Sequence, residues 1–461
     1  MADSHRFDPS ILREYDIRGT VGETLNPADL VAIGRAFGTI LARAGGKTAA
    51  TGYDGRLSSP ELEASLAEGL QSAGIEVRRI GRGPTPMLYF ATHHLSTDAG
   101  LMITGSHNPP EFNGVKIMMQ GKSFFGADIQ KLGAMAAAGD FAEGAGTDSH
   151  HEILDAYVAR LLKDVDGDKP LTIAWDAGNG AAGEALVKLV AGLPGRHILL
   201  NENIDGTFPA HHPDPTVEKN LAQLKEAVAA NNCDLGIAFD GDGDRIGVVD
   251  GQGRVLWGDQ LLAILARDVL ARHPGATVIA DVKTSRVFFD EIERLGGKPM
   301  MWKTGHSHIK SKMAEIGAPL AGEMSAHIFF KDRYYGYDDA LYAAVRLLNV
   351  LNGTSDSLAD LLDSMPKTVS TPEIRFDCAD DRKFKVVDEV RDRLTRLSGI
   401  DVHDMDGVRV QSEAGWWLLR ASNTQPVLVA RCEAADAAGL ETLKAALVDQ
   451  LAQSGLEAPD L

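Results

Sequence analysis

Asp240, Asp242 and Asp244 stand at alternate positions in the run DGDGDR, between two short apolar stretches. Three carboxylates in a glycine-containing turn can converge on one hard divalent cation, because glycine permits the backbone angles that direct the side chains inward. A calcium-binding EF-hand loop is excluded, since its sixth and twelfth positions would here be Arg245 and Gly251 in place of Gly and Glu. The pattern predicts a Mg²⁺ site with a position left for a phosphate oxygen, and a solvated acidic turn is the alternative.

Ser106 lies in the run TGSHNPP, directly after the apolar stretch 100–104. This places it at the carboxyl end of a predicted strand, where α/β proteins bind ligands. A serine needs a base, a metal or prior phosphorylation to take part in group transfer. The acyl-transfer motif GxSxG is absent because position 108 is Asn, and the phosphate-binding P-loop is absent because Lys116 stands where its first Gly belongs. A polar turn without a role is the alternative.

Two further polar runs have ligand-binding side chains. In GEMSAH, Glu323 and Ser325 are two positions apart, so in extended chain they face the same way and can bind neighbouring hydroxyls of a sugar, with His327 on the same face. In RASNTQP, Arg420 precedes hydroxyl and amide side chains in a predicted turn, which together form a phosphate nest. The alternative for both runs is an ordinary polar surface segment.

One motif favours different chemistry. Gly178–Gly183 matches GxGxxG after the predicted strand 171–177, and Glu202 follows about 20 residues later, as in a dinucleotide-binding unit. This pattern is typical of an NAD(P)-dependent oxidoreductase. The alternative is a glycine-bearing turn that packs one strand against one helix.

The elements that must position these residues alternate along the chain, because short Val/Ile-rich runs follow Ala/Leu-rich helical patterns, as in α/β proteins. The predicted helices are 27–44, 60–73 and 259–272, and the predicted strands are 100–104, 171–176, 235–239, 277–281 and 427–431. Composition shifts at 136–146, 250–253 and 368–372 divide the 461 residues into four segments of ordinary domain size.

Composition restricts the partners. The formal net charge is −19, and so acidic a surface repels nucleic acid and anionic membranes. An anionic ligand then requires basic residues gathered locally. The three cysteines are scattered, the first 19 residues are too polar for a signal peptide, and no apolar run approaches about 18 residues. We therefore expect a cytoplasmic protein that binds neither nucleic acid nor membrane.

The four motifs TGSHNPP, DGDGDR, GEMSAH and RASNTQP occur in this order and together closely resemble those of the α-D-phosphohexomutases, in particular the bacterial phosphomannomutase/phosphoglucomutase branch. The resemblance spans nearly the whole chain, from Glu14 to Pro426. It implies an α/β, multi-domain fold with three similar α/β domains and a smaller C-terminal α+β domain around one central cleft. The implied domains are 1–150 (phosphoserine), 151–254 (metal), 255–368 (sugar) and 369–461 (phosphate). It also implies that the GxGxxG run is only a structural turn.

The activity implied by the resemblance is reversible isomerisation of hexose 1-phosphate and hexose 6-phosphate, with mannose or glucose or both as the sugar. Phosphoryl transfer would proceed through a phosphoserine and a hexose 1,6-bisphosphate, with Mg²⁺ as cofactor and the bisphosphate as activator and intermediate. A phosphoglucosamine mutase is the alternative within the family, and an NAD(P)-dependent oxidoreductase is the alternative outside it. Both a monomer and a dimer remain open.

The resemblance also implies roles for individual residues. The implied catalytic residues are Ser106, His107, Lys116, Arg18, Arg245 and His327, with the proton transfer open between Lys116 and His327. The implied metal ligands are Ser106, Asp240, Asp242 and Asp244. The implied substrate-binding residues are Tyr15, Lys283, His306, Glu323, Ser325, Arg420, Ser422, Asn423 and Thr424. The chain has Gly105 and Ala326 where relatives often have Ala and Gly, and we expect the added methyl group of Ala326 to narrow the sugar specificity.

Overall fold

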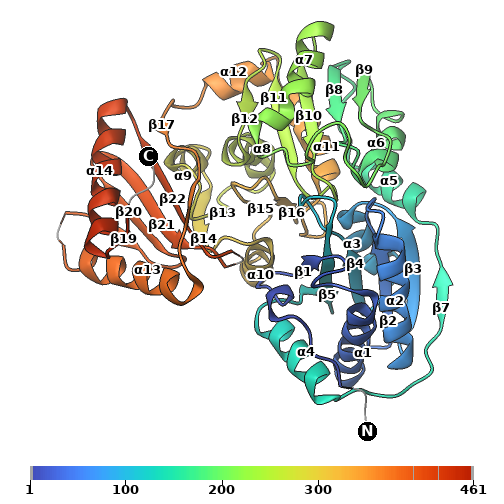
Figure 1. Ribbon diagram of the computed structural model, residues 1–461. Helices are drawn as coiled ribbons and strands as arrows, with labels where there is room; N and C mark the ends of the chain where they lie inside the picture. Colours follow the sequence, from blue (N-terminus) through green and yellow to red (C-terminus); the bar gives the residue numbers. More distant parts are fainter. Residues whose placement is uncertain (1–3, 398, 424, 458–461) are drawn as a thin grey trace.

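The computed structural model describes residues 4–397, 399–423 and 425–457, which fold around four β-sheets that follow one another along the sequence (Figure 1). The first three sheets combine parallel and antiparallel strands with helices between them, whereas the fourth sheet is antiparallel. The predicted fold class, three α/β units and a C-terminal α+β unit, is confirmed.

The first sheet has the strand order β1-β5-β4-β2-β3-β7, with β6 paired to β5. Its strands are β1 (Ile17–Thr20), β2 (Thr48–Tyr53), β3 (Glu76–Arg82), β4 (Ala99–Ile103), β5 (Phe112–Met119), β6 (Lys122–Ser123) and β7 (Asp148–His150). Its helices are η1 (Pro9–Ile11), α1 (Pro27–Arg43), α2 (Ser59–Ser72), α3 (Thr85–His94) and α4 (Ala127–Ala138). Every residue of β4 is buried, as expected for a central strand covered on both faces. The loop that contains Ser106 begins at the carboxyl end of this buried strand.

The second sheet has the order β12-β11-β10-β8-β9. Its elements are α5 (Leu154–Leu162), β8 (Thr172–Asp176), α6 (Gly183–Val190), β9 (Arg196–Leu200), η2 (Glu218–Leu221), α7 (Ala222–Asn231), β10 (Leu235–Phe239), β11 (Ile246–Asp250) and β12 (Val255–Leu256). Strands β10 and β11 form an antiparallel hairpin in which all ten residues are buried. The hairpin holds the connecting loop 240–245 between two rigid strands.

The third sheet has the order β14-β13-β15-β16. Its elements are α8 (Gly258–Arg272), β13 (Thr277–Asp281), α9 (Arg286–Arg294), β14 (Lys298–Trp302), α10 (His306–Ile316), β15 (Leu320–Gly322), β16 (Ile328–Phe330), α11 (Ala340–Asn352) and α12 (Leu358–Asp363). Strands β13, β14 and β15 are parallel, so the loops that follow them leave from one edge of the sheet. Those loops contain Lys283, Thr304 and Glu323.

The fourth sheet has the order β17-β22-β21-β20-β19, with β18 also paired to β22. Its elements are β17 (Val369–Ser370), β18 (Ile374–Asp377), α13 (Asp380–Leu394), β19 (Asp401–His403), β20 (Val408–Ser412), β21 (Gly415–Ala421), β22 (Val427–Ala434) and α14 (Ala437–Gln453). This unit, red and orange in Figure 1, lies to one side of the rest of the molecule.

The hydrophobic core explains why the fourth unit lies apart from the other three. One continuous cluster contains buried side chains from all of the first three units, including Met102, Trp175 and Leu265. The fourth unit has its own cluster, with Val386 and Leu447 packed against its sheet. The first three units therefore form one body, to which the fourth is attached through a small apolar contact and through hydrogen bonds such as those from Arg409 to the carbonyls of Val282 and Thr284.

Most of the predicted elements occur where the sequence places them. Predicted strands 235–239 and 277–281 coincide with β10 and β13, and the predicted strand 427–431 is longer, ending at Ala434 in β22. Among the described residues no helix is long and apolar enough to cross a membrane. All three cysteines are buried and unpaired.

Candidate active site

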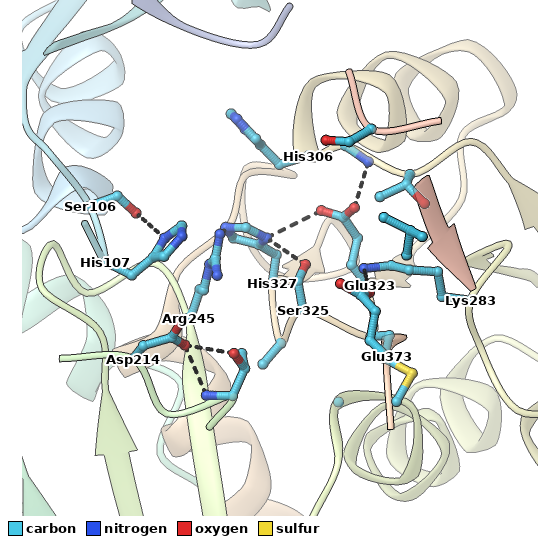
Figure 2. A pocket seen from close by; sticks show the side chains of 18 of the residues that line it. Ser106, His107, Asp214, Arg245, Lys283, His306, Glu323, Ser325, His327 and Glu373 are labelled. Atoms are coloured by element: carbon cyan, nitrogen blue, oxygen red, sulfur yellow. Dashed lines mark hydrogen bonds and ion pairs between the residues drawn. The ribbon is translucent and has the colours of Figure 1, made fainter. Parts of the chain in front are cut away.

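A cavity of about 610 Å³ lies where loops from all four units meet. The predicted site residues that line it are Tyr15, Arg18, Ser106, His107, Lys116, Arg245, Lys283, His306, Glu323, Ser325, His327, Arg420, Ser422 and Asn423. Figure 2 shows side chains from the Ser106 loop, the β10–β11 loop and the third unit pointing into this space. The structure thus brings together predicted residues that lie up to about 400 positions apart in the chain.

Ser106 is held in an unusual backbone conformation. Its φ is +51°, in the left-handed region, and its side chain is buried. Its amide N–H donates to Oγ1 of Thr104. Its Oγ lies 3.3 Å from Nδ1 of His107 and donates to Oδ2 of Asp240 at 3.2 Å. The strained loop therefore presents the serine hydroxyl to the acidic loop of the second unit.

Arg56 fixes the conformation of the Ser106 loop, and the sequence motifs did not indicate it. Its guanidinium is fully buried, pairs with Asp54, and donates to the backbone carbonyls of Ser106, Asn108, Pro109 and Phe112. Gly105 is needed for this packing, because a Cβ at position 105 would lie 2.4 Å from Cζ of Arg56. The buried side chain of Arg56 thus explains why position 105 is Gly and not Ala.

The three aspartates of DGDGDR converge, as predicted. Asp240, Asp242 and Asp244 are completely buried, and one oxygen of each lies within 4.8 Å of the others. Nζ of Lys116 donates to Oδ2 of Asp242 at 2.7 Å and also to Asp244. Burial, together with the charges of Asp242 and Asp244, raises the pKa of Asp240 well above its usual value.

This donor set fits a divalent cation. Oδ1 of Asp242 is buried and accepts no hydrogen bond from the residues the structure describes, while Oδ1 of Asp244 faces Nε2 of His327 at 3.3 Å. Buried carboxylate oxygens without partners are costly unless a cation neutralises them. Carboxylate ligands in this number suit Mg²⁺, which completes its coordination with water or phosphate oxygens. The structure therefore supports the predicted metal ligands by the chemistry of the donors.

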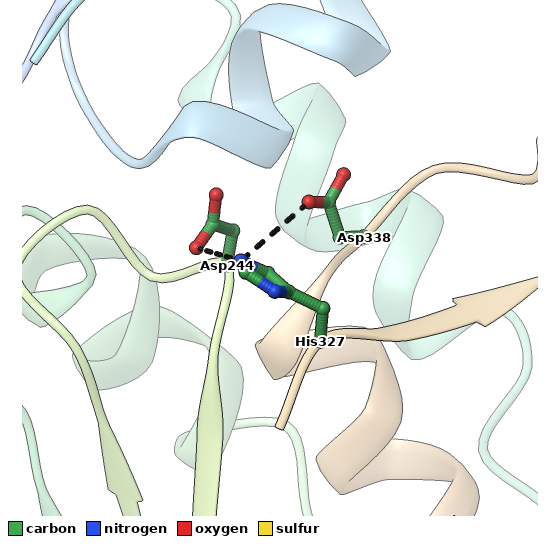
Figure 3. A group of neighbouring side chains, drawn as sticks. All are labelled: Asp244, His327 and Asp338. Atoms are coloured by element: carbon green, nitrogen blue, oxygen red, sulfur yellow. Dashed lines mark ion pairs between the residues drawn. The ribbon is translucent and has the colours of Figure 1, made fainter. Parts of the chain in front are cut away.

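His327 lies between the loop 240–245 and Glu323, and it contacts both. A backbone bridge joins Arg245 to His327, which brings Nε2 of His327 to 3.3 Å from Oδ1 of Asp244 and 3.9 Å from Oδ2 of Asp338 (Figure 3). Burial lowers the pKa of His327, but Asp244 and Glu323 outweigh it, so the pKa is raised to about 9. The imidazole is accordingly protonated at neutral pH.

The predicted extended conformation of Glu323 and Ser325 is wrong. Strand β15 ends at Gly322, and residues 323–326 form a turn in which the N–H of Ala326 donates to the carbonyl of Glu323. Ala326 has a φ of +67°, a conformation that glycine adopts more easily than alanine. The choice between Ala and Gly at this position therefore affects the backbone strain of the turn. Oε2 of Glu323 and Oγ of Ser325 nevertheless converge, each 3.2 Å from Nδ1 of His327.

The fourth unit brings to the cavity the residues that were predicted to form a phosphate nest. Arg420 is buried at the end of β21 and pairs with Oδ1 of Asp406 at 3.2 Å. Nδ2 of Asn423 donates to the hydroxyl of Tyr15 at 2.7 Å, which links the fourth unit to the first. Ser422 lines the same part of the cavity. Thr424, also predicted here, lies outside the described residues.

Basic side chains gather in the cavity against the overall charge. Arg18 donates to the carbonyl of Gly105, and Lys283 lies in the loop after β13. Burial, with Arg245 nearby, lowers the pKa of His107 well below its usual value, and burial lowers that of His306 well below its usual value too. Both of these imidazoles are therefore neutral.

Several site residues were not predicted from the sequence. Besides Arg56, they are Thr85, which donates to Asp242, Asp214 and Glu373, which line the cavity, and Asp338, which lies beside His327 and His306. None of them belongs to one of the four motifs. Only their burial or their position relative to other loops marks them.

The GxGxxG run has a packing role. The N–H of Ala181 donates to the carbonyl of Gly241, and a Cβ at Gly180 would lie 2.9 Å from the same oxygen. The backbone of the metal-binding loop thus occupies the space above the glycine turn. The run supports the Asp240–Asp244 loop, in agreement with the structural alternative.

Comparison with known proteins supports the family resemblance of the four motifs over nearly the whole chain. Models of the three α/β/α domains and the C-terminal domain of phosphoglucomutase/phosphomannomutase match residues 9–143, 155–253, 257–369 and 373–450. The phosphomannomutase/phosphoglucomutase of Pseudomonas aeruginosa is 44% identical over 442 residues, which cover 96% of this chain and 95% of that protein.

Solved structures agree. A phosphoglucomutase/phosphomannomutase family protein from Burkholderia thailandensis superimposes with a TM-score of 0.93 at 41% identity, covering 98% of this chain and 99% of that one. An Aspergillus fumigatus N-acetylphosphoglucosamine mutase, solved with GlcNAc-6P and magnesium, shares the fold at 14% identity and a TM-score of 0.61, covering 97% of each chain. With its four motifs assembled around one cavity, the chain belongs to the phosphoglucomutase/phosphomannomutase family.

Proposed function

We propose that this phosphohexomutase interconverts the 1-phosphates and 6-phosphates of both glucose and mannose, through a phosphoserine at Ser106 and a hexose 1,6-bisphosphate. The observation that carries the proposal is the buried contact of 3.2 Å between Asp240 and Ser106, which lines the same cavity as Arg420 and Glu323. A phosphoryl acceptor, a cation site, a sugar site and a phosphate site are then all within reach of one ligand.

We assign a separate role in the reaction to each of four proposed domains, 1–150, 151–254, 255–368 and 369–461. The first supplies the phosphoserine, the second the metal ligands, the third the sugar contacts and the fourth the phosphate clamp. Support comes from the four sheets, each of which sends loops into the cavity.

In the resting enzyme Ser106 is phosphorylated and gives its phosphoryl group to the free hydroxyl of the sugar phosphate. The bond between Oγ and phosphorus breaks as the bond to the sugar oxygen forms, which yields the bisphosphate. The bisphosphate turns in the cavity and returns its other phosphoryl group to Ser106. Arg18, His107, Lys116 and Arg245 surround the transferring group, and their N–H donors orient it.

Asp240, Asp242 and Asp244 would hold Mg²⁺, with an oxygen of the Ser106 phosphate as a further ligand. A bound Mg²⁺ supplies positive charge beside Oγ of Ser106, where negative charge develops as the phosphoryl group leaves. The buried Oδ1 of Asp242, which has no hydrogen-bond partner among the described residues, supports this assignment.

We assign the proton of the reacting hydroxyl to the neutral form of His327, which the imidazole reaches by first releasing its own proton to solvent. Its Nδ1 lies 3.2 Å from Oγ of Ser325 and 3.2 Å from Oε2 of Glu323, so it adjoins the proposed sugar site. Lys116 is instead held by two carboxylates of the metal loop, and the same carboxylates raise its pKa, against the effect of burial. The pKa of His327, although also raised by carboxylates, lies closer to neutral pH than that of Lys116, so the neutral imidazole is the more accessible base.

Glu323 and Ser325 would bind O3 and O4 of the sugar, which are equatorial in both glucose and mannose. Arg420, Ser422, Asn423 and Thr424 would hold the phosphate that is not reacting, in either orientation of the sugar, with Tyr15, Lys283 and His306 completing the site. A site that binds O3 and O4 and makes no contact at C2 accepts both sugars. The three buried, unpaired cysteines are consistent with a reducing compartment, the cytoplasm. The partners would be small phosphorylated hexoses, which the basic side chains gathered in the cavity attract against the overall negative charge.

A coupled assay tests the proposal. Glucose 1-phosphate, mannose 1-phosphate and glucosamine 1-phosphate are supplied separately, each primed with a trace of the matching 1,6-bisphosphate and Mg²⁺. Turnover of the first two and little turnover of the third is expected. Turnover of glucosamine 1-phosphate alone would instead favour a phosphoglucosamine mutase.

A further inference from the structure

Glu373 is an acidic residue among the cations that the proposed function gives to the substrate phosphate. Its side chain lines the cavity together with Lys283, Arg375 and Arg420. A carboxylate in this position repels a phosphate dianion and competes with it for the same cations. A pocket that served only to hold phosphate tightly would have an apolar or basic residue here.

The contacts of Glu373 show which cations it occupies. Nζ of Lys283 donates to Oε2 of Glu373 at 3.1 Å (Figure 2), and Nε and Nη2 of Arg375 donate to Oε1 at 2.9 and 2.6 Å. Lys283 has one other carboxylate nearby among the described residues, Asp281, at 3.8 Å. Glu373 is thus the principal ion-pair partner of a buried lysine in the phosphate site.

The position of Glu373 in the chain connects this ion pair to the junction between the body and the fourth unit. Glu373 directly precedes β18, in the segment that leads from the third unit into the fourth. Lys283 belongs to the body, after β13, and Arg375 belongs to the fourth unit, on β18. The side chain of Glu373 is 25% exposed, so its carboxylate has solvent to move into when it leaves Lys283.

Asp406 is a further carboxylate of this region, and its contacts differ from those of Glu373. Asp406 pairs with Arg420 through Oδ1, while its Oδ2 accepts the backbone N–H of Thr304 at 2.9 Å. Asp406 is not among the residues that line the cavity. It is fixed in the structure behind Arg420, whereas Glu373 faces the space that the phosphate would occupy.

We propose that Glu373 is an internal counter-ion of the phosphate site. It pairs with Lys283 when no phosphate is bound, is displaced from Lys283 when the non-reacting phosphate enters, and returns when the bisphosphate turns. This competition keeps the phosphate site weak enough to release its ligand in every catalytic cycle. The release step rests on the proposed function, whereas the competition for Lys283 rests on the geometry alone.

Calorimetric titration of the full-length protein with inorganic phosphate tests the competition. Glu373→Gln is expected to bind phosphate roughly three- to thirty-fold more tightly than the wild type, because the competing charge is removed. Asp377→Asn is the matched control, since it makes the same change in charge on β18 but is exposed and does not line the cavity. Lys283→Met tests whether phosphate binds at this lysine, and this variant should bind phosphate more weakly than the wild type. Unchanged or weaker binding in Glu373→Gln, equal tightening in Asp377→Asn, or unchanged binding in Lys283→Met overturns the proposal.

Steady-state kinetics test the release step. Glu373→Gln should lower KM for hexose phosphate and also lower kcat, because a phosphate held more tightly leaves the site more slowly. Glu373→Ala serves as a second variant, with the melting temperature of each variant measured alongside. A lower KM with an unchanged or higher kcat would refute the release step. Absence of turnover in the wild type would refute the proposed function and leave the phosphate titration decisive for Glu373.

Discussion

Oγ of Ser106 and Oδ2 of Asp240 lie 3.2 Å apart, although 134 positions separate them in the chain. The first stands on the loop after β4 and the second on the loop after β10. Each loop leaves a fully buried strand, so the contact is held by two rigid sheets. This contact is the reason for expecting phosphoryl transfer at Ser106.

The first prediction concerns the modification of Ser106. Intact-mass analysis of freshly purified protein should find one phosphate, and peptide analysis should place it on Ser106. Ser106→Ala should lack the phosphate and lose activity by more than about 10³-fold, because the phosphoryl carrier is gone. Full activity of this variant without added bisphosphate would exclude the mechanism.

The metal site leads to the second prediction. Asp242→Asn should lower kcat by about 10²- to 10³-fold and change KM much less, since the charge of the cation matters chiefly in the transition state. Treatment with EDTA should abolish turnover, and Mg²⁺ should restore it. Normal turnover of the metal-free protein would show that the acidic loop is only structural.

The third prediction tests the phosphate clamp. Arg420→Ala should raise KM for glucose 1-phosphate and mannose 1-phosphate by a similar factor, roughly ten- to a hundred-fold, from the loss of about 1.5–3 kcal/mol of charge-assisted hydrogen bonding. Arg391→Ala, on the outer helix α13 and outside the cavity, is the control and should change neither value. An effect on one sugar alone would contradict a contact with phosphate.

Arg56 provides a test of how the Ser106 loop is held. Arg56→Met should lower the free energy of unfolding by about 3–5 kcal/mol, because Asp54 loses its buried partner. It should also lower kcat, because four backbone carbonyls of the loop lose their donor. Arg82→Met removes an exposed pair with Glu184 and should cost less than about 1 kcal/mol. Equal losses in urea denaturation of the two variants would contradict the assignment.

A pH dependence of stability is expected from Asp339. Burial raises its pKa to about 6, above the ordinary value of 3.8, against the hydrogen bonds it accepts from the N–H of Tyr342 and from the hydroxyls of Tyr334 and Tyr157. Between these two pH values the folded state binds more protons than the unfolded state, so this group makes the protein less stable as pH rises from about 4 to 6.

The measurement compares the wild type with Asp339→Asn. Urea unfolding at pH 4.5 and pH 7 should show the wild type gaining stability relative to the variant at the lower pH. A stability difference between the two proteins that is the same at both pH values would show that Asp339 does not titrate in this range.

The local patterns of the sequence were sufficient for most of the elements and for the convergence of the three aspartates. Strands β10 and β13 were predicted with their bounds because the apolar runs that form them are ended by turn residues of the chain itself. The triad Asp240–Asp244 was also predicted, since its spacing and its glycines act within six residues. These features depend on neighbours in the sequence.

The tertiary structure alone decided which side chains meet. The GEMSAH motif indicated that Glu323, Ser325 and His327 face the same way, but the turn that brings them together was not predicted. Arg56 stabilises the Ser106 loop from a position about 50 residues away, so no motif indicated it. The contact between Glu373 and Lys283 could not be predicted for the same reason. Burial, ion pairing and left-handed backbone angles are set by the packing of distant segments, and that packing is determined by the whole chain and not by any short run of it.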